Sequence, residues 1–111
     1  MVPVVRPEDG ELLGYVGGDG NKWFAATIFG YVFKEAASGD EAETLVRSRG
    51  LDVLTGVWQY YDEKDDDWKF CIIKEASPKS VTVIKTNYMG YQDSAVSDIV
   101  TLDHPATSLR K

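Results

Sequence analysis

The chain has few of the residues that build covalent, metal or nucleophilic sites. Its 111 residues include one cysteine, Cys71, and one histidine, His104. A single cysteine cannot form an intramolecular disulfide, and the sequence has no Cys-x-x-Cys pair and no Cys/His cluster that would bind a metal. We therefore expect no metal and no cofactor, and we expect a reduced, cytoplasmic protein.

Long apolar runs are also missing. No stretch approaches the roughly 18 apolar residues of a membrane-spanning helix. The residues after Met1, VPVVRPEDGE, have neither the basic start nor the apolar core of a secretory signal peptide. These absences predict no membrane partner and agree with a cytoplasmic location.

Basic residues are outnumbered by acidic ones. The sequence has 12 Lys and Arg against 18 Asp and Glu, which gives a net charge of -6. Such a charge repels a phosphate backbone, so nucleic acid ranks below protein as the expected partner. Lys69, Lys74, Lys79 and Lys85 still form a modest basic stripe, which leaves nucleic-acid binding open as an alternative.

The sequence also lacks a nucleophilic catalytic signature. His104 is the only histidine and precedes Pro105, no G-x-S-x-G motif is present, and Cys71 lies in an apolar segment where a thiolate is disfavoured. We predict no catalytic residue and a non-enzymatic protein.

The residues that are present predict a folded, β-rich chain. Hydrophobic residues make up 43% of the sequence, enough for one domain's core. Apolar segments from Leu12 to Phe33 are separated by glycine-rich turns, as in antiparallel strands, and the Val2–Val5 segment can add an edge strand. The glycines at 17–20 do not make a phosphate loop, because a strand rather than a helix follows them.

One short helix is expected at about 39–49. Ser38 is a good N-cap, Glu41 completes a capping box, and Gly50 follows as the expected left-handed residue after the last turn. Because such a helix has only about three turns, it must pack on a sheet to be stable.

The stretch Val57–Pro78 reads as a long β-hairpin with an acidic tip. Its apolar and aromatic residues alternate, as expected for strands, and the tip between them has the sequence DEKDDD. We expect Trp58, Tyr60, Trp68, Phe70 and Ile72 in the core. Further strands are expected at Val81–Thr86 and Ser97–Leu102, followed by a frayed tail.

These patterns predict an α+β, mostly β fold in a single domain, 1–111. The N-terminal part is an antiparallel meander with the one helix, and the C-terminal half is a small-barrel-like antiparallel sheet. Two sub-halves are expected, at 11–50 and 51–105.

Folding of the hairpin does not by itself require the acidic residues of the tip. Its carboxylates are those of Asp62, Glu63, Asp65, Asp66 and Asp67. The spacing does not fit an EF-hand loop, because Lys64 occupies a ligand position and the central glycine is absent. A solvated hairpin tip, a weak cation site and a protein-docking patch remain alternatives, and we place the candidate partner-binding site here.

Residues 55–103 resemble the Tudor group of small five-stranded barrels. The likeness rests on Trp58, the acidic tip, the strand DWKFCII, the strand VTVIK, and the aromatic-glycine loop at Tyr88–Tyr91. The resemblance implies a binding module in which aromatic rings hold a methylated Lys or Arg. Candidate wall residues are Trp58, Tyr60, Tyr61, Trp68 and Tyr88, although such a stripe more often reflects core and cross-strand packing, which is the favoured interpretation.

The first hairpin contains GYV at 14–16 and DGNKWFA at 19–25, and a capped helix and a β-rich end follow it. With these features the whole chain also resembles small uncharacterised proteins of actinobacteria and their phages. Together with the acidic hairpin, this likeness suggests a non-enzymatic cytoplasmic interaction protein that binds a partner protein through its acidic and aromatic hairpin. The likeness to phage proteins also suggests that the protein is phage-encoded. The alternative is a regulator that binds or mimics nucleic acid. The oligomeric state is left open: an exposed strand edge at residues 2–5 or 97–102 could pair two copies of the chain, and the sequence does not decide this.

Overall fold

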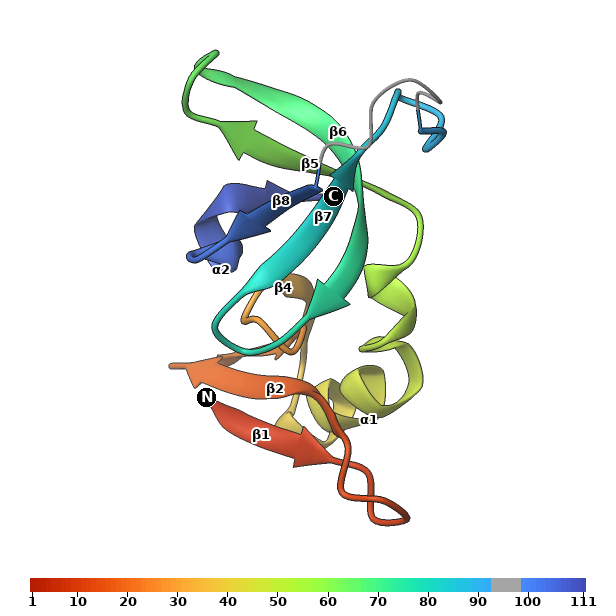
Figure 1. Ribbon diagram of the computed structural model, residues 1–111. Coiled ribbons are helices and arrows are strands. Elements are labelled where there is room, and N and C mark those ends of the chain that lie inside the picture. The colour runs from red at the N-terminus through yellow and green to blue at the C-terminus, as the bar shows by residue number, and fades with distance from the viewer. Residues whose placement is uncertain (93–98) are drawn as a thin grey trace. The chain divides into compact units, whose positions relative to one another are not determined.

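The computed structural model describes residues 1–92 and 99–111, and it confirms an α+β, mostly β fold (Figure 1). The chain divides into unit 1, Met1–Leu54, and unit 2, Thr55–Lys111. The elements of unit 1 are β1 Val2–Val5, β2 Leu12–Asp19, β3 Lys22–Ala26, β4 Val32–Ala36, α1 Gly39–Arg49 and the 3-10 turn Asp52–Leu54. Those of unit 2 are β5 Val57–Asp62, β6 Asp67–Ala76, β7 Val81–Lys85, β8 Ile99–Leu102, α2 Pro105–Ser108 and β9 Leu109–Arg110.

Unit 1 is a four-stranded antiparallel meander with α1 packed on it. The strand order is β1-β2-β3-β4, so the Val2–Val5 segment is an edge strand as the sequence predicts. The core between the helix and the sheet is small-residue rich, which brings the two elements close together. Its buried residues are Val4, Leu13, Val16, Ala25, Ala42 and Val46.

The helix begins and ends where the sequence predicts. Ser38 Oγ accepts a hydrogen bond from the Glu41 N–H at 3.1 Å, and the Glu41 carboxylate accepts one from the Ala37 N–H at 3.0 Å. These bonds satisfy two amide donors at the start of the helix. The capping box is therefore present, with its second bond one residue earlier than in the standard form.

Gly50 has a different role from the one expected. Its backbone is right-handed, with φ -54°, and its N–H donates to the Val46 carbonyl oxygen at 2.9 Å. A Cβ at this position would lie 2.3 Å from the carbonyl oxygen of Leu13. Glycine is required here because the helix end approaches β2 closely, and a positive φ is not involved.

Unit 2 is a five-stranded antiparallel sheet in the order β8-β7-β6-β5-β9. The last strand returns to pair beside the first, through Gln59 with Arg110 and Tyr60 with Leu109. In the described part of unit 2, β8 and β9 are the two edges of the sheet and do not pair with each other, so the barrel-like sheet is open.

The tail does not fray as expected. Pro105 begins the single turn α2, and β9 then adds to the sheet with Leu109 only 2% exposed. Proline is well suited to the first helical position because it has no N–H to satisfy there. The expected last strand is confirmed as β8 from Ile99, and residues 97 and 98 lie outside the described residues.

Across the described residues, no helix is both long enough and apolar enough to cross a membrane.

Candidate functional site

The β5–β6 hairpin has two faces of different character. Its register pairs Trp58 with Cys71, Tyr60 with Lys69, and Tyr61 with Trp68. Because neighbouring side chains on a strand point to opposite faces, Trp58 and Tyr60 share one face, and Tyr61 and Trp68 share the other. We call these the inner and outer faces of the hairpin.

The inner face is the core of unit 2. Trp58 and Cys71 are fully buried, Tyr60 is 4% exposed, and Val81 and Val83 of β7 are also buried. Burial raises the pKa of the Cys71 thiol to about 12, which keeps it protonated and unreactive at neutral pH. Two of the candidate wall residues, Trp58 and Tyr60, therefore belong to the core.

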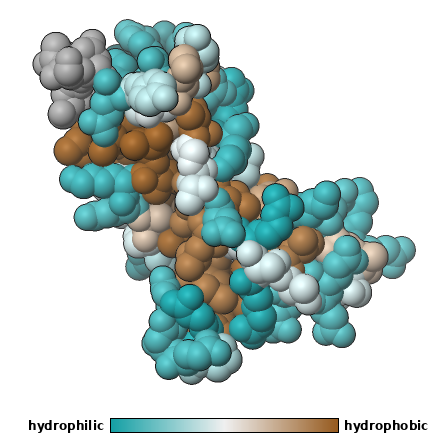
Figure 2. All heavy atoms as spheres, turned by 90° about the vertical axis from the view of Figure 1, so that its right-hand side faces the viewer, coloured by the Kyte–Doolittle hydropathy of each residue, from teal (hydrophilic) through white to brown (hydrophobic). Residues whose placement is uncertain are grey.

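The outer face was partly misassigned from sequence. We expected Trp68, Phe70 and Ile72 in the core with Trp58, but Phe70 is 38% exposed, and Trp68 and Ile72 are half-buried. The expectation was wrong for Phe70 because the register places Cys71, and not its neighbours, opposite Trp58. Figure 2 shows exposed hydrophobic surface, in brown, bordered by hydrophilic side chains in teal.

Tyr61, Trp68 and Arg110 form a stack on the outer face. The rings of Tyr61 and Trp68 pack edge to face with centroids 5.5 Å apart. The guanidinium carbon of Arg110 lies 4.2 Å from the Trp68 ring centroid, and Arg110 Nε donates to Gln59 Oε1 at 2.9 Å. A cation of the chain itself thus occupies the face of Trp68.

Tyr88 belongs to the loop that follows β7 and not to the hairpin. Its side chain is 71% exposed, and the neighbouring Met89 and Tyr91 are 57% and 65% exposed. The turn is organised by Asn87, whose Oδ1 accepts from the N–H groups of Met89 and Tyr91. Among the described residues, Tyr61 and Trp68 are in ring contact and Tyr88 contacts neither ring, so these residues do not assemble a complete aromatic cage.

The tip is solvated along its whole length. Residues 63–67 are exposed, and Asp62 is half-buried. Asp62 Oδ1 accepts from the Lys64 N–H at 3.0 Å, and Asp67 Oδ1 accepts from the Trp68 N–H at 2.8 Å, so these two carboxylates shape the turn. Asp66 has φ 50°, a left-handed conformation that aspartate tolerates better than most residues.

One ion pair ties the tip to β6. Lys69 Nζ lies 2.5 Å from Asp65 Oδ2. The hydrogen bond and charge of Lys69 hold the pKa of Asp65 below its usual value, and the pKa of Lys69 is raised in return. Both partners are partly or largely solvated, so the pair adds little stability, and the tip keeps an excess of negative charge.

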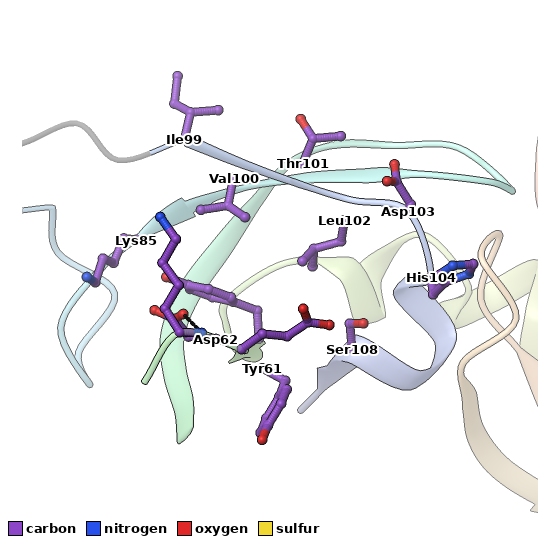
Figure 3. Close-up of a pocket in the computed structure, with 13 residues that line it drawn as sticks. Tyr61, Asp62, Lys85, Ile99, Val100, Thr101, Leu102, Asp103, His104 and Ser108 are labelled. Atoms are coloured by element: carbon purple, nitrogen blue, oxygen red, sulfur yellow. Dashed lines mark hydrogen bonds between the residues drawn. The ribbon is translucent and has the colours of Figure 1, made fainter. Parts of the chain in front are cut away.

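A pocket of about 850 Å³ lies beside the tip (Figure 3). One wall is the strand β8 with its two following residues, and the opposite wall is the end of β5 with the start of the tip. Val100 and Leu102 point into the pocket, whereas Ile99 and Thr101 point away from it. Its lining residues are Tyr60–Lys64, Lys85, Ile99–His104 and Ser108.

His104 lies at the far end of this pocket from Lys85 (Figure 3). Its backbone carbonyl oxygen accepts from the N–H groups of Thr107 and Ser108, at 3.2 and 3.0 Å, and so starts α2. Within the described residues, the hydrogen bonds of His104 are made by this carbonyl, and its imidazole is not hydrogen-bonded to a hydroxyl that could act as a nucleophile.

Within residues 1–92 and 99–111, no three His, Cys, Asp or Glu side chains come close enough together to hold a metal ion. The five tip carboxylates are spread around an exposed turn, and three of them are committed to Lys64, Trp68 and Lys69 as described above.

Two contributors to the site differ in how well the sequence predicted them. Arg110 was missed because the tail was expected to fray, whereas an exposed strand edge at 97–102 was expected, as a contact between two copies of the chain. The signal for the former was available: Pro105 at a helix start and the apolar Leu109 beyond it are typical of a short turn that docks a following strand.

Comparisons with family models, with curated proteins and with solved structures found no significant match. The resemblance to Tudor-like barrels and the suggested phage origin therefore stay predictions from the sequence pattern.

Proposed function

We propose that this chain is a non-enzymatic, protein-binding module that contacts its partner through the β5–β6 hairpin. The observation that carries the proposal is the tip itself. Five carboxylates occupy six consecutive positions, residues 63–67 are exposed, and the turn contributes no buried side chain. Like charges this close repel each other, and a basic partner relieves that repulsion.

The outer face gives the tip a neighbouring contact surface. Tyr61 and Trp68 are half-buried and Phe70 is exposed, directly beside the last residues of the tip. Aromatic side chains next to a charged rim are typical of protein interfaces. We infer a partner that places basic side chains on the tip and apolar or aromatic ones on the outer face.

The strand number of unit 2 agrees with a Tudor-like barrel, but fewer of its aromatic residues are free to form a binding cage than the sequence resemblance implies. Unit 2 has five antiparallel strands, which supports it, but Trp58 and Tyr60 are core residues and Arg110 covers Trp68. A methylated cation would have to displace Arg110 to reach that ring. We therefore assign partner recognition to the tip and place the protein in the cytoplasm, with phage origin as a further proposal.

The test compares capture of partners from a lysate of the source organism by three tagged proteins. The first is the wild type, and the second replaces Asp65, Asp66 and Asp67 with Asn, which keeps side-chain size and turn hydrogen bonding. The third makes the same change in net charge elsewhere, with Glu8→Gln, Asp19→Asn and Glu75→Gln at exposed positions.

Quantitative mass spectrometry should show a protein that wild type and the control capture and the tip variant loses. Melting temperatures of the three proteins should agree within a few degrees, because the tip carboxylates are exposed. Equal capture by the tip variant and the wild type would overturn the role of the tip. Capture of nucleic acid in place of protein would favour the alternative regulator.

A further inference from the structure

The edge strand β8 borders the pocket and offers backbone groups to a partner. In the described part of unit 2, β8 is paired with β7 alone, from Val81 with Leu102 to Ile84 with Ile99. Alternate residues of an antiparallel strand direct their N–H and C=O groups to opposite sides. Half of the backbone polar groups of β8 therefore point out from the sheet edge, where an added strand can pair with them.

The pocket provides the space for such a strand. Six consecutive residues, Ile99–His104, line one side of it, and five consecutive residues, Tyr60–Lys64, line the other. A strand rises about 3.3 Å per residue, so β8 can pair with a segment of about four residues. The volume of about 850 Å³ is that of a groove which takes a short extended segment.

The side chains on the two walls define what this segment must carry. Val100 and Leu102 point into the groove (Figure 3), with Leu102 only 9% exposed, and Asp62, Glu63 and Lys64 line the facing wall. Lys85 lines the groove as well, so the carboxylates of Asp62, Glu63 and Asp103 outnumber its two lysines. Asp103 continues the first wall. A Lys or Arg side chain fits this combination, because its aliphatic stem can lie on Val100 and Leu102 while its charged head reaches the carboxylates.

The alternating neighbours of the added strand face the other side. Ile99 and Thr101 point away from the groove, and Ile99 is 53% exposed. Apolar or β-branched residues suit that side, as cross-strand neighbours on a sheet face. The recognised pattern is therefore basic and apolar residues in alternation.

A second copy of this chain is a poor occupant of the edge. Each copy carries a net charge of -6, so two copies repel each other. A nucleic acid is disfavoured by the same carboxylates. A basic protein segment gains from them.

We propose that the open edge of β8 binds an extended, alternately basic and apolar segment of the partner protein as an added strand, in the groove between β8 and the acidic tip. This inference rests on the proposed function, because Asp62 and Glu63 belong to the same tip. To the proposed function it adds a binding mode, in which main-chain hydrogen bonds join the partner segment to β8. It also adds the sequence pattern that the partner segment must have.

The test uses the full, ¹⁵N-labelled chain and the peptide acetyl-(Val-Lys)₃-amide as the probe. Titration should shift the amide resonances of Ile99–Leu102 and of Asp62 and Glu63. Hydrogen exchange at alternate amides of β8 should slow on peptide binding, because new backbone bonds form there. Acetyl-(Val-Glu)₃-amide, and the lysine peptide N-methylated at alternate residues, should not cause this protection.

A variant tests the electrostatic wall. Replacing Glu63 with Gln and Asp103 with Asn should weaken binding of the lysine peptide about fivefold at low salt, with exchange of the free β8 amides unchanged. The pair Glu8→Gln and Asp19→Asn is the control and should bind as the wild type does.

The outcomes separate the two proposals. Strand addition would be overturned by any of three results. The peptide does not protect the amides of Ile99–Leu102, self-association protects them without peptide, or single-stranded DNA protects them equally well. If capture from lysate still requires Asp65–Asp67 in that case, the proposed function stands alone. Protection of β8 together with undiminished capture by the tip variant would instead remove the proposed function of the tip.

Discussion

The guanidinium of Arg110 lies over the indole ring of Trp68, 4.2 Å from its centroid, and connects β9 to the outer face of the hairpin. The same side chain donates to Gln59 across the β5–β9 pairing. β9 is only two residues long, and it is also held by its pairing with β5 and by Leu109, which is 2% exposed. Arg110 therefore both helps to attach β9 and covers the ring of Trp68.

Replacing Arg110 with Ala should lower the free energy of unfolding by about 1 kcal/mol, because a cation–π contact and a hydrogen bond are lost together. Arg110→Lys should recover only part of this, since an ammonium lacks the planar guanidinium that stacks on a ring. Urea denaturation measures both effects. Arg49→Ala is the control for the charge and should cost less than Arg110→Ala; equal losses would contradict the stacked arrangement.

The core assignment predicts opposite outcomes for two aromatic residues of one hairpin. Trp58 is fully buried and Phe70 is 38% exposed. Trp58→Ala should cost about 3 to 5 kcal/mol or prevent folding, while Phe70→Ala should cost less than about 1 kcal/mol. Trp58→Phe, which leaves a smaller cavity, keeps the comparison measurable by urea denaturation if the alanine variant does not fold. Similar losses for Phe70→Ala and Trp58→Phe would show that the two faces are exchanged.

The close approach at the helix end predicts a large effect of a single methyl group. Gly50→Ala would place a Cβ 2.3 Å from the Leu13 carbonyl oxygen and 2.6 Å from that of Val46, and backbone atoms cannot move aside cheaply. We expect a loss of about 2 kcal/mol or more in the free energy of unfolding. Gly39→Ala is the matched control, because its nearest contact is the Trp23 side chain at 3.3 Å. Thermal melting of the two variants measures the difference in stability. A Gly50→Ala protein as stable as the Gly39→Ala protein would refute the close packing of the helix end on β2.

The buried thiol predicts a loss of stability at high pH. The folded state raises the pKa of Cys71 from 9.0 to about 12, so above pH 9 the unfolded chain releases a proton that the folded chain retains. Stability contributed by the neutral thiol is therefore full below pH 9 and is lost as the pH rises toward 12, at up to about 1.4 kcal/mol per pH unit. Urea midpoints at about pH 8 and pH 10.5 should fall further for wild type than for Cys71→Ala. Equal declines would mean that the thiol ionises in the folded chain.

Local signals in the sequence were sufficient for the elements that depend on local bonds. Ser38 and Glu41 determine where α1 begins, and the alternating aromatic residues on either side of DEKDDD predict β5 and β6. In both cases the interactions that define the element lie within a few residues of each other, so they can be read without tertiary structure.

Features that depend on distant residues were not predicted. The pairing of Cys71 with Trp58, which exposes Phe70, is set by the register of two strands across the tip. The need for Gly50 comes from Leu13 on another element, and the docking of Leu109 and Arg110 comes from β5. An exposed edge at 97–102 was expected, but its place beside the pocket was not predicted, because strand order is a property of the whole sheet.

The claim that the tip carboxylates contact the partner is tested most directly by the salt dependence of binding. The measurement is the Kd of the captured partner for wild type, for the Asp65→Asn, Asp66→Asn, Asp67→Asn variant and for the charge-matched control, over a range of NaCl concentrations. Close ionic contacts weaken as salt screens them. We predict a steep rise of Kd with salt for wild type and control, and a weaker, nearly salt-independent binding for the tip variant. The same slope for all three proteins would contradict the account.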